Sequence, residues 1–374
     1  MSSLIPVNRP RIYTEDKEFL KKYTDENWIS SESPAISEFE VALATRFDRK
    51  HAIAVSSGTA ALEIAFKTLD LNPGDEVIMP SFTIISCAQA VTKLGGIPVF
   101  VDSNIDDYNM DVDQIENKIT SRTKAILAVH IYGLPSRLDL IQEISRKHNL
   151  FLIEDAAEVI GANLVGKPCG SFGDLSIMSF YANKHISTGE GGAILTNSSE
   201  LAEKSMYFRN LCFIKERRFY HLDIGWNYRM TGLQAAVGLG QILNLNLTLN
   251  RKNNIASIYD ERLSGINEIV TPIKSKPFGK NCYWVYAILL KPGLGVNANF
   301  IISNLRKKGV ESRPFFYPLH KQPALISFLK EDQDSCPNAE YLGEYGFYLP
   351  SGIGNTDSEI MISAETLKEV LSEI

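Results

Sequence analysis

Apolar and polar positions along the first 250 residues predict strands and helices in alternation. Short apolar runs are each followed by an amphipathic stretch with helical periodicity. The predicted strands lie at residues 51–56, 75–80, 97–102, 125–130, 150–155 and 193–196. Continuous apolar runs are typical of strands that are buried on both faces. We therefore expect an α/β fold in which helices sandwich a mostly parallel sheet.

Helices are expected between these strands and also before and after them. The predicted helices lie at residues 13–27, 36–47, 60–69, 86–94, 112–119, 138–148 and 201–209, and a long one runs from Gly232 past Leu243. The composition turns polar at residues 250–254. We place a boundary there, between a large α/β domain (residues 1–250) and a smaller α+β domain (residues 251–374). In the smaller domain the pattern predicts strands at 283–290 and 310–316, and helices at 300–308 and 359–373.

The composition narrows the range of partners. The 374 residues are 44% hydrophobic and 22% charged, with a formal net charge of −6. No dense stripe of lysine and arginine is present, so we expect no nucleic-acid partner. No apolar run approaches the length that spans a bilayer, so we expect no membrane partner. The nearest thing to a basic cluster, Lys215, Arg217 and Arg218, fits either a solvated loop or a site for an anionic ligand.

The cysteines and histidines do not form a recognisable metal or redox motif. The five cysteines are scattered, and no two of them have metal-ligand or redox spacing. We interpret them as reduced thiols of a cytoplasmic protein. The six histidines show no His-x-x-x-His pair, so we expect no metal site.

One lysine lies between an aromatic run and a glycine-rich turn. The stretch Ser179–Gly192 reads Ser-Phe-Tyr-Ala-Asn-Lys-His-Ile-Ser-Thr-Gly-Glu-Gly-Gly. The glycines mark backbone that bends tightly or comes close to another group. If the apolar residues bury Lys184, its pKa falls and its amine becomes a nucleophile suited to a Schiff base. The alternative is an ordinary surface lysine beside a hairpin turn; the glycines and the upstream residues favour the reactive amine.

Polar residues end several of the predicted strands. Ser57-Gly58-Thr59 joins a strand directly to a helix, which exposes backbone N–H groups at a positive helix end and predicts a phosphate site. The alternative for this tripeptide is a plain helix N-cap. His130 and Asp155 also end strands, and such residues can face one crevice. Asp155 has the alternative of capping a following helix.

Seven motifs occur in the order and near the spacing of one known family. They are Ser57–Leu62, Pro73–Ile78, Pro98–Asp102, Val129–Gly133, Ile153–Glu158, Ser179–Gly192 and Asn227–Met230. Together they resemble the motifs of the nucleotide-sugar aminotransferases, and the resemblance covers nearly the whole chain. This family is a branch of the aspartate-aminotransferase (fold type I) superfamily, which uses pyridoxal 5′-phosphate (PLP).

The resemblance implies roles for three residues around the cofactor ring. Lys184 matches the lysine that forms a Schiff base with PLP and moves a proton between cofactor and substrate. Asp155 matches the carboxylate that pairs with the pyridine nitrogen and makes the ring an electron sink. Glu158 falls where the family places Gln or Glu near the ring hydroxyl. His185 stands one place beyond the cofactor lysine, so the register favours aminotransfer over the dehydration that relatives with histidine at the lysine position perform.

The resemblance also implies a phosphate site and a partner subunit. Gly58, Thr59 and Ser179 match phosphate-binding positions. Asn227 matches an asparagine that reaches the phosphate of the neighbouring subunit's cofactor, which implies a homodimer with shared active sites. Ile84 stands where relatives carry an aromatic residue that stacks on the ring, and Phe82 is the candidate to compensate.

Within the family, the chain is most similar to 4-aminotransferases of the GDP-perosamine synthase type. The similarity lies in Asn183-Lys184, Thr188–Gly192, Gly225–Thr231 and Glu311–His320. Such enzymes convert a nucleotide-linked 4-keto-6-deoxy sugar to the 4-amino-4,6-dideoxy sugar with L-glutamate as donor. The substrate contacts implied here are Trp28, Ser30, His130, Arg313, Tyr317 and His320. The alternatives are a 3-aminotransferase that acts on a 3-keto nucleotide sugar, a PLP-binding regulatory protein without turnover, and an α/β binding protein without PLP.

Overall fold

A seven-stranded sheet forms the centre of the larger part of the computed structural model, which describes residues 4–329 and 335–374. The strands are β1 (His51–Val55), β2 (Glu76–Pro80), β3 (Ile97–Val101), β4 (Thr123–Val129), β5 (Phe151–Asp155), β8 (Leu175–Ser179) and β9 (Gly192–Thr196). Their order is β1-β9-β8-β5-β4-β2-β3, and β9 runs antiparallel to both of its neighbours while β2, β3, β4, β5 and β8 pair in parallel. The predicted mostly parallel sheet is confirmed.

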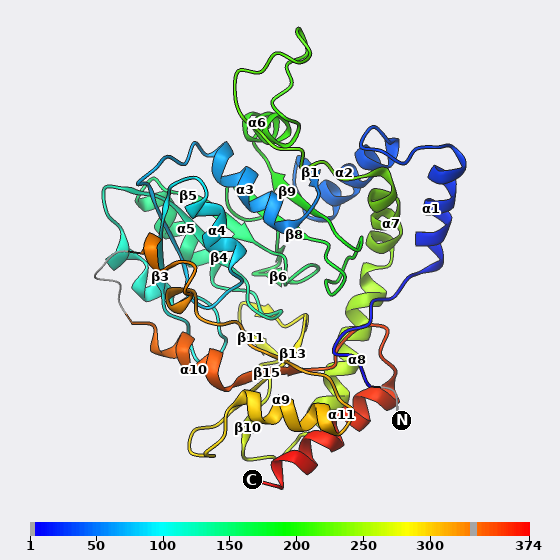
Figure 1. Ribbon diagram of the computed structural model, residues 1–374, viewed down its shortest axis with the longest axis vertical. Coiled ribbons are helices and arrows are strands. Elements are labelled where there is room, and N and C mark those ends of the chain that lie inside the picture. Colours follow the sequence, from blue (N-terminus) through cyan, green and yellow to red (C-terminus); the bar gives the residue numbers. More distant parts are fainter. Residues whose placement is uncertain (1–3, 330–334) are drawn as a thin grey trace.

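Helices cover both faces of this sheet, as the sequence predicts (Figure 1). The first face packs against α3 (Gly58–Thr68), α4 (Ser86–Thr92) and α6 (Ser199–Arg209), and the second against α2 (Pro34–Arg46), α5 (Leu138–Lys147) and α7 (Gly232–Leu243). Successive side chains of a strand point to opposite faces. Ile53 accordingly packs in one core and Ala52 in the other.

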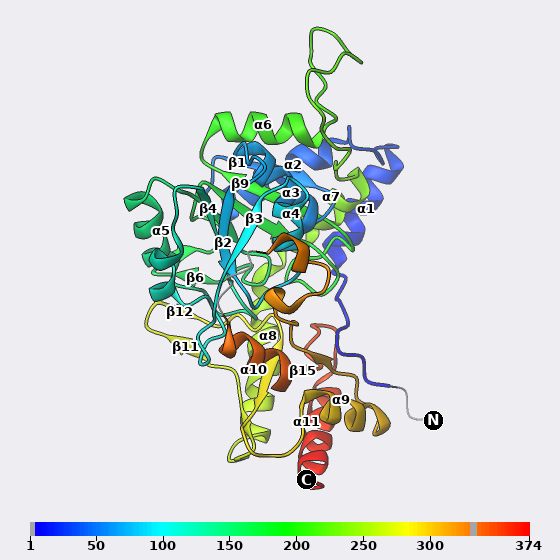
Figure 2. The ribbon, with the colours of Figure 1, turned by 60° about the vertical axis from the view of Figure 1, so that its left-hand side comes forward.

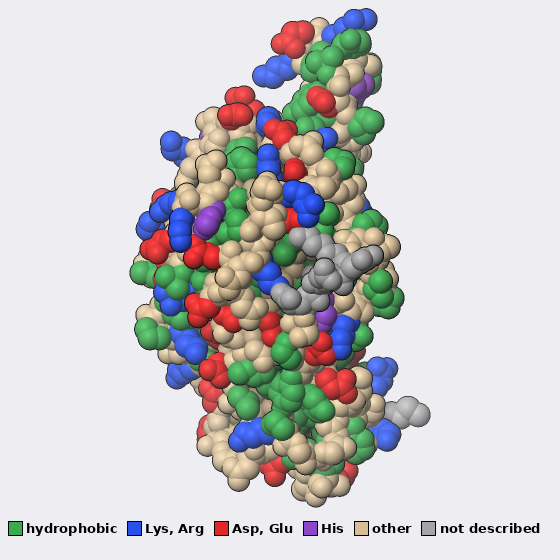
Figure 3. Space-filling view, turned by 90° about the vertical axis from the view of Figure 1, so that its left-hand side faces the viewer, with side chains coloured by type: hydrophobic (Ala, Val, Ile, Leu, Met, Phe, Trp, Pro, Cys, Tyr) green, Lys and Arg blue, Asp and Glu red, His purple; other side chains and the backbone are tan. Residues whose placement is uncertain are grey.

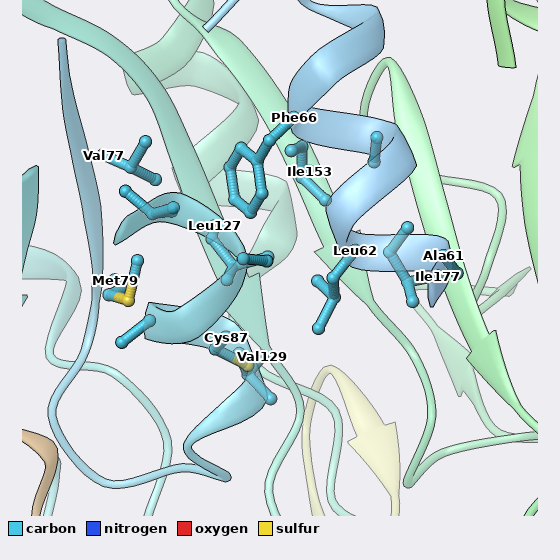
Figure 4. Close-up of a cluster of buried hydrophobic side chains, with 14 of the residues drawn as sticks. Ala61, Leu62, Phe66, Val77, Met79, Cys87, Leu127, Val129, Ile153 and Ile177 are labelled. Atoms are coloured by element: carbon cyan, nitrogen blue, oxygen red, sulfur yellow. The ribbon is translucent and has the colours of Figure 1, made fainter. Parts of the chain in front are cut away.

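The core under α3 is dry and closely packed (Figure 4). Leu62 and Phe66 extend from α3 toward Leu127 and Ile153 of the sheet, and each of these side chains is at most 2% exposed. Burial of one such side chain stabilises the fold by about 1.5–3 kcal/mol. This packing fixes the first turn of α3 against the sheet.

The second part of the chain forms a smaller antiparallel sheet with its own helices (Figure 2). The strands β10 (Ile269–Val270), β13 (Tyr286–Leu290), β15 (Gly346–Leu349) and β14 (Arg313–Pro314) lie in that order. Helices α8 (Leu245–Arg262), α9 (Ala298–Lys307) and α11 (Asp357–Leu371) share its hydrophobic core. The remaining regular elements are α1 (Thr14–Asp25), α10 (Pro337–Tyr345), β6 (Asn163–Leu164), β7 (Lys167–Pro168), β11 (Ser275–Lys276) and β12 (Gly279–Lys280).

Three details of the predicted elements are wrong. Residues 112–119 form two 3₁₀ turns rather than a helix, and Ile115 is their fully buried apolar anchor. The long helix after Gly232 breaks at Asn244, whose side-chain amide bonds back to the carbonyl of Gly240. The predicted strand at 310–316 shrinks to the two residues of β14, since Pro314 lacks an N–H group for a longer ladder.

The proposed division at residue 250 falls within α8, and Ile5 pairs with Val310 of the second part. The division stays a prediction.

No helix within the described residues is both long and apolar enough to cross a membrane. All five cysteines are buried.

Candidate active site

A cavity of about 370 Å³ lies at the carboxyl ends of β4, β5 and β8, beside the first turn of α3. This is the edge of an open α/β sheet at which ligands collect. Aromatic side chains of the second part of the chain, Trp284, Phe316 and Tyr348, close its other side. The cavity wall contains six of the predicted site residues: Gly58, Thr59, Asp155, Glu158, Ser179 and Lys184.

Lys184 lies in a tight turn and aims its amine at an acidic and aromatic wall. Its N–H donates to the carbonyl of Tyr181 at 2.9 Å, which fixes the turn. Its Nζ lies 3.7 Å from Oε1 of Glu158 and 3.6 Å from the ring centroid of Trp284. Burial lowers the pKa of Lys184, while the negative charges of Glu158 and Asp155 oppose that shift. The alternative of a surface lysine is not met, since 10% of this side chain is exposed.

Two buried carboxylates face the same space. The backbone N–H of Tyr132 donates to Oε2 of Glu158 at 2.9 Å. Burial raises the pKa of Glu158 to about 7, and the positive charge of Lys184 opposes the rise. Asp155 accepts a bond from the N–H of Ala157 at 3.1 Å, and burial raises the pKa of Asp155 as well. No helix follows β5, so Asp155 does not act as a helix cap.

The first turn of α3 forms a cradle of free donors. Ser57 caps the helix through its Oγ, which accepts from the N–H of Ala60 at 3.1 Å. The N–H groups of Gly58 and Thr59 have no hydrogen-bond partner in the part of the chain that the structure describes. A Cβ at position 58 would lie 2.9 Å from Cβ of Ser179, so glycine allows α3 to approach β8 this closely. Ser57 therefore caps the helix, and the two free N–H groups beside it are suited to binding an anion.

These features fit PLP, which has an aldehyde, a basic ring nitrogen and a phosphate. Lys184 offers an amine for the aldehyde, and Asp155 offers a buried carboxylate for the ring nitrogen. Gly58, Thr59 and Ser179 offer N–H and hydroxyl donors for the phosphate. All of them line one cavity, whose volume lies within the range of small-molecule sites.

The sequence did not predict the aromatic wall of the cavity, which Trp284, Phe316 and Tyr348 form. Trp284 is 5% exposed, and its Nε1–H donates to the carbonyl of Asn183 at 3.0 Å. The ring of Trp284 also stacks on Phe316, with centroids 6.5 Å apart. The apolar run at 283–290 predicted the strand, but the pattern of one strand does not show which distant element its rings meet.

Ile84 lines the cavity, whereas Phe82 does not. Phe82 is fully buried and packs on Tyr132, Phe315 and Phe316. Phe82 therefore does not take the place of Ile84 in the cavity wall.

Two histidines predicted to contact the substrate bond to other protein groups outside the cavity. His130 is fully buried, with Nε2 3.1 Å from Oε1 of Glu154 and Nδ1 accepting from the N–H of Ser136 at 2.8 Å. Because Val129 faces the cavity, the next residue of the chain turns to the opposite side. His320 lies outside the cavity wall, between Ser81 at 2.6 Å and Glu340 at 3.1 Å.

The structure does not bring the remaining predicted residues into the cavity wall. Trp28, Ser30, Asn227, Arg313 and Tyr317 are all exposed to solvent. Asn227 accepts a bond from Nε of Arg229 at 2.9 Å, close to the end of β1. These five side chains are open to a substrate or to a second subunit.

His130, Glu154 and Cys169 place three potential metal ligands within 4.8 Å of one another. The oxygens of Glu154 already accept bonds from the N–H groups of Gly170 and Phe172 and from Oγ of Ser176. Protein donors therefore already occupy the oxygens of Glu154, and the cluster fits a structural role rather than a metal site.

The basic cluster lies on a loop that projects from the body between α6 and α7, which we call the projecting loop (residues 211–224; Figure 1). Figure 3 shows hydrophobic side chains and charges of both signs mixed on it. Ile224 is 90% exposed and Phe219 75%. Isolated loops seldom expose apolar side chains in such a group, so this one is suited to contact another surface.

The model of the DegT/DnrJ/EryC1/StrS aminotransferase family matches residues 10–367. The chain is 39% identical over 367 residues to a GDP-perosamine synthase of Caulobacter vibrioides, covering 98% of each chain. It is 37% identical over 369 residues to a GDP-perosamine synthase of Escherichia coli O157:H7, covering 99% of each. A UDP-N-acetyl-3-dehydro-alpha-D-glucosamine 3-aminotransferase of Acidithiobacillus ferrooxidans is 35% identical over 304 residues, which covers 80% of this chain and 79% of that one.

Solved structures share the fold over the whole chain. An aminotransferase from Streptoalloteichus hindustanus superposes with a TM-score of 0.92 at 26% identity, covering 99% of both chains. A Streptococcus pneumoniae protein described as a sugar aminotransferase, in its PLP form, superposes with a TM-score of 0.91 at 25% identity, also covering 99% of both. The chain therefore belongs to the DegT/DnrJ/EryC1/StrS aminotransferase family and is a PLP-dependent sugar aminotransferase.

Proposed function

We propose that this enzyme converts a nucleotide-linked 4-keto-6-deoxy sugar to the 4-amino-4,6-dideoxy sugar, with L-glutamate as amino donor. The observation that carries the chemistry is the amine of Lys184, which faces Glu158 inside a cavity that also contains Asp155 and the α3 cradle. The choice of substrate rests on the full-length similarity to GDP-perosamine synthases. The proposed cellular location is the cytoplasm, and the product would serve polysaccharide synthesis such as that of a lipopolysaccharide O-antigen.

The proposed roles follow from what each group can do. When bound, PLP supplies an electron-withdrawing ring that stabilises negative charge on the substrate carbon. Asp155 would hold the ring nitrogen protonated through its negative charge. Gly58, Thr59 and Ser179 would fix the phosphate with uncharged donors and the helix dipole.

Lys184 would act both as the covalent anchor and as the proton carrier. Burial lowers its pKa and so favours the neutral amine, which can take a proton from the amino donor and return it to the acceptor. Glu158 lies 3.7 Å from this amine and would keep it oriented. Trp284 excludes water from one side of the amine, since its ring lies directly against it.

The charges of the cavity support a homodimer with shared active sites. Lys184 is the one cation in the described cavity wall, which also contains Asp155, Glu158 and Glu190. L-Glutamate and a nucleotide diphosphate are anions, so more positive charge is needed than this wall supplies. The projecting loop of a second subunit, with exposed Lys215, Arg217 and Arg218, is the proposed source. Asn227 would reach the partner's cofactor from the same region.

Four exposed residues remain proposed contacts of the sugar nucleotide: Trp28, Ser30, Arg313 and Tyr317. Tyr317 follows Phe316 of the cavity wall, so this side of the opening can continue the site outward. We propose no substrate contact for His130 or His320, because their ring nitrogens are engaged within the protein.

The test is turnover of the PLP-loaded enzyme with L-glutamate and GDP-4-keto-6-deoxymannose. We expect 2-oxoglutarate and a GDP sugar with nitrogen at C4, as identified by NMR of the purified product. The dTDP- and UDP-linked 4-keto sugars, run in parallel, report the nucleotide preference. Formation of 2-oxoglutarate without amination of any 4-keto sugar would contradict the proposed substrate.

A 3-aminotransferase is the second candidate, since a relative with that activity is 35% identical over 304 residues. It predicts that a 3-keto nucleotide sugar is aminated faster than the 4-keto sugar. Competition between the two keto sugars in one mixture separates these candidates.

A further inference from the structure

The carboxylate of Asp155 contacts a thiol through Oδ2, while its other oxygen contacts the backbone. Sγ of Cys87, on α4, lies 3.7 Å from Oδ2 of Asp155. Oγ1 of Thr83 lies 3.8 Å from the same sulfur. Cys87 is fully buried, Thr83 is 2% exposed and Asp155 is 4% exposed, so no water competes for these contacts.

Counting protons fixes the direction of this chain of bonds. An ionised carboxylate only accepts, so the single proton of Cys87 must point at Oδ2 of Asp155. The sulfur then has lone pairs alone to offer, so the hydroxyl of Thr83 donates to it. The other oxygen, Oδ1, accepts from the N–H of Ala157 at 3.1 Å. Each oxygen of Asp155 therefore has one fixed donor within the protein.

The packing of α4 holds the thiol in place. Figure 4 shows Cys87 beside Val129 in the buried cluster. Val129 and Asp155 are register partners on adjacent strands, and both line the cavity. Burial and the negative charge of Asp155 raise the pKa of Cys87 well above its ordinary value, so the thiol stays protonated and remains a donor.

We propose that Cys87 is a positioning residue, which holds Oδ2 of Asp155 in place and keeps this carboxylate ionised for the ring nitrogen of the cofactor. The inference rests on the role proposed above for Asp155. Burial disfavours the ionised carboxylate, and every donor aimed at it offsets part of that penalty. Without the S–H group, Asp155 would ionise less readily and would be free to turn away from the ring.

The hydrogen bond can be tested directly, without cofactor. The S–H stretching band of cysteine absorbs in an infrared window that other protein groups leave clear. The difference between wild-type apo-protein and Cys87→Ala should contain one band at a lower frequency than that of an unbonded thiol, as a hydrogen bond to a carboxylate requires. A band at the position of an unbonded thiol would overturn the proposal. Asp155→Asn should move the Cys87 band toward the unbonded position.

The consequence for the cofactor is measured with the apo-proteins by titration with PLP. We expect Cys87→Ala to raise the dissociation constant about 3- to 10-fold, the range for loss of one bond to a charged group with a weak donor. Cys87→Ser should stay within about twofold of wild type, because a hydroxyl replaces the donor. Cys169→Ala removes a thiol that is equally buried but is not the one that bonds to Asp155, and it should also stay within about twofold.

Equal dissociation constants for Cys87→Ala and Cys169→Ala would overturn the role toward the cofactor. Failure of the underlying assignment looks different. If Asp155→Asn binds PLP as tightly as wild type, the role of Asp155 is wrong, whatever the infrared band of Cys87 shows.

Discussion

Two buried lysines, Lys184 and Lys252, both contact Trp284. The amine of Lys184 packs 3.6 Å from the centroid of the indole ring, inside the cavity. The amine of Lys252, on α8, donates to the backbone carbonyls of Trp284 at 2.8 Å and Ser351 at 2.6 Å, outside the cavity wall. Burial lowers the pKa of both, in the case of Lys252 to about 7.

The difference shows that burial alone does not make a lysine reactive. The amine of Lys252 donates hydrogen bonds to two backbone carbonyls outside the cavity wall. These bonds join α8 to the segments around Trp284 and Ser351. The amine of Lys184 faces the cavity, and its ion-pair partner Glu158 lies at the longer distance of 3.7 Å. A free cavity next to the amine, together with carboxylates that shift its pKa, separates Lys184, the proposed catalytic lysine, from Lys252.

The largest expected effect is that of Lys184→Ala. We expect transamination to fall by at least about a thousand-fold, because the variant loses both the nucleophile and the proton carrier. The measurement is the steady-state rate of 2-oxoglutarate formation. The matched control is Lys252→Met, which removes the other buried amine and should keep the rate within about tenfold of wild type. Equal losses in both variants would mean that the two lysines do not differ as described.

The next effect is that of Asp155→Asn. An amide cannot supply the negative charge that would hold the ring nitrogen protonated, so we expect kcat to fall by roughly a hundred-fold. The control is Glu190→Gln, which neutralises another acid of the cavity wall and should change kcat by less than about fivefold. If Glu190→Gln is the more damaging change, the assignment of Asp155 fails.

Lys252→Met should act on stability rather than on chemistry. The carbonyls of Trp284 and Ser351 would lose their donor, and a buried acceptor without a partner costs about 1–3 kcal/mol. Relief from burying the amine offsets part of this loss, so we expect the free energy of unfolding to fall by about 2 kcal/mol. Urea denaturation of wild type and variant measures it. A variant as stable as wild type would show that the two bonds contribute little.

The smallest effect, counted per pH unit, is a dependence of stability on pH. The pKa of Lys252 is about 7 in the folded protein and 10.5 ordinarily, so between these values the unfolded chain binds more protons. Stability due to this residue therefore rises as the pH rises from about 7 toward 10.5, by up to about 1.4 kcal/mol per pH unit. The difference in unfolding free energy between wild type and Lys252→Met should carry this slope. If the difference in unfolding free energy did not change from pH 7 to 10, the pKa of Lys252 would not be lowered, and this prediction would be wrong.

Much of the fold and half of the site follow from local rules. Apolar runs located six of the seven strands of the large sheet and missed β8. Residues at strand ends, such as Asp155 and Gly58, met in one cavity because parallel strands end at one edge. The same rule failed for His130. The residue lies at the correct edge but on the other face, next to Glu154, since neighbours on a strand alternate in direction.

Features that depend on distant packing were not predictable. Trp284, Phe316 and Tyr348 reach the cavity only because the second sheet docks on the first, and nothing in their own segments encodes that contact. Lys252 lies in a polar stretch that was interpreted as a boundary, yet it is 2% exposed within a continuous helix. The sequence around Lys184 was informative because its glycines and aromatic neighbours are themselves part of the site.

The visible absorption spectrum of the PLP-loaded protein, before and after addition of L-glutamate, tests the central claim most directly. We expect wild type and Lys252→Met to be yellow and to lose this colour with glutamate, whereas Lys184→Ala should not respond. A wild-type protein that stays colourless after PLP is supplied, or a Lys184→Ala protein that responds like wild type, would contradict the assignment of Lys184 as the reactive amine.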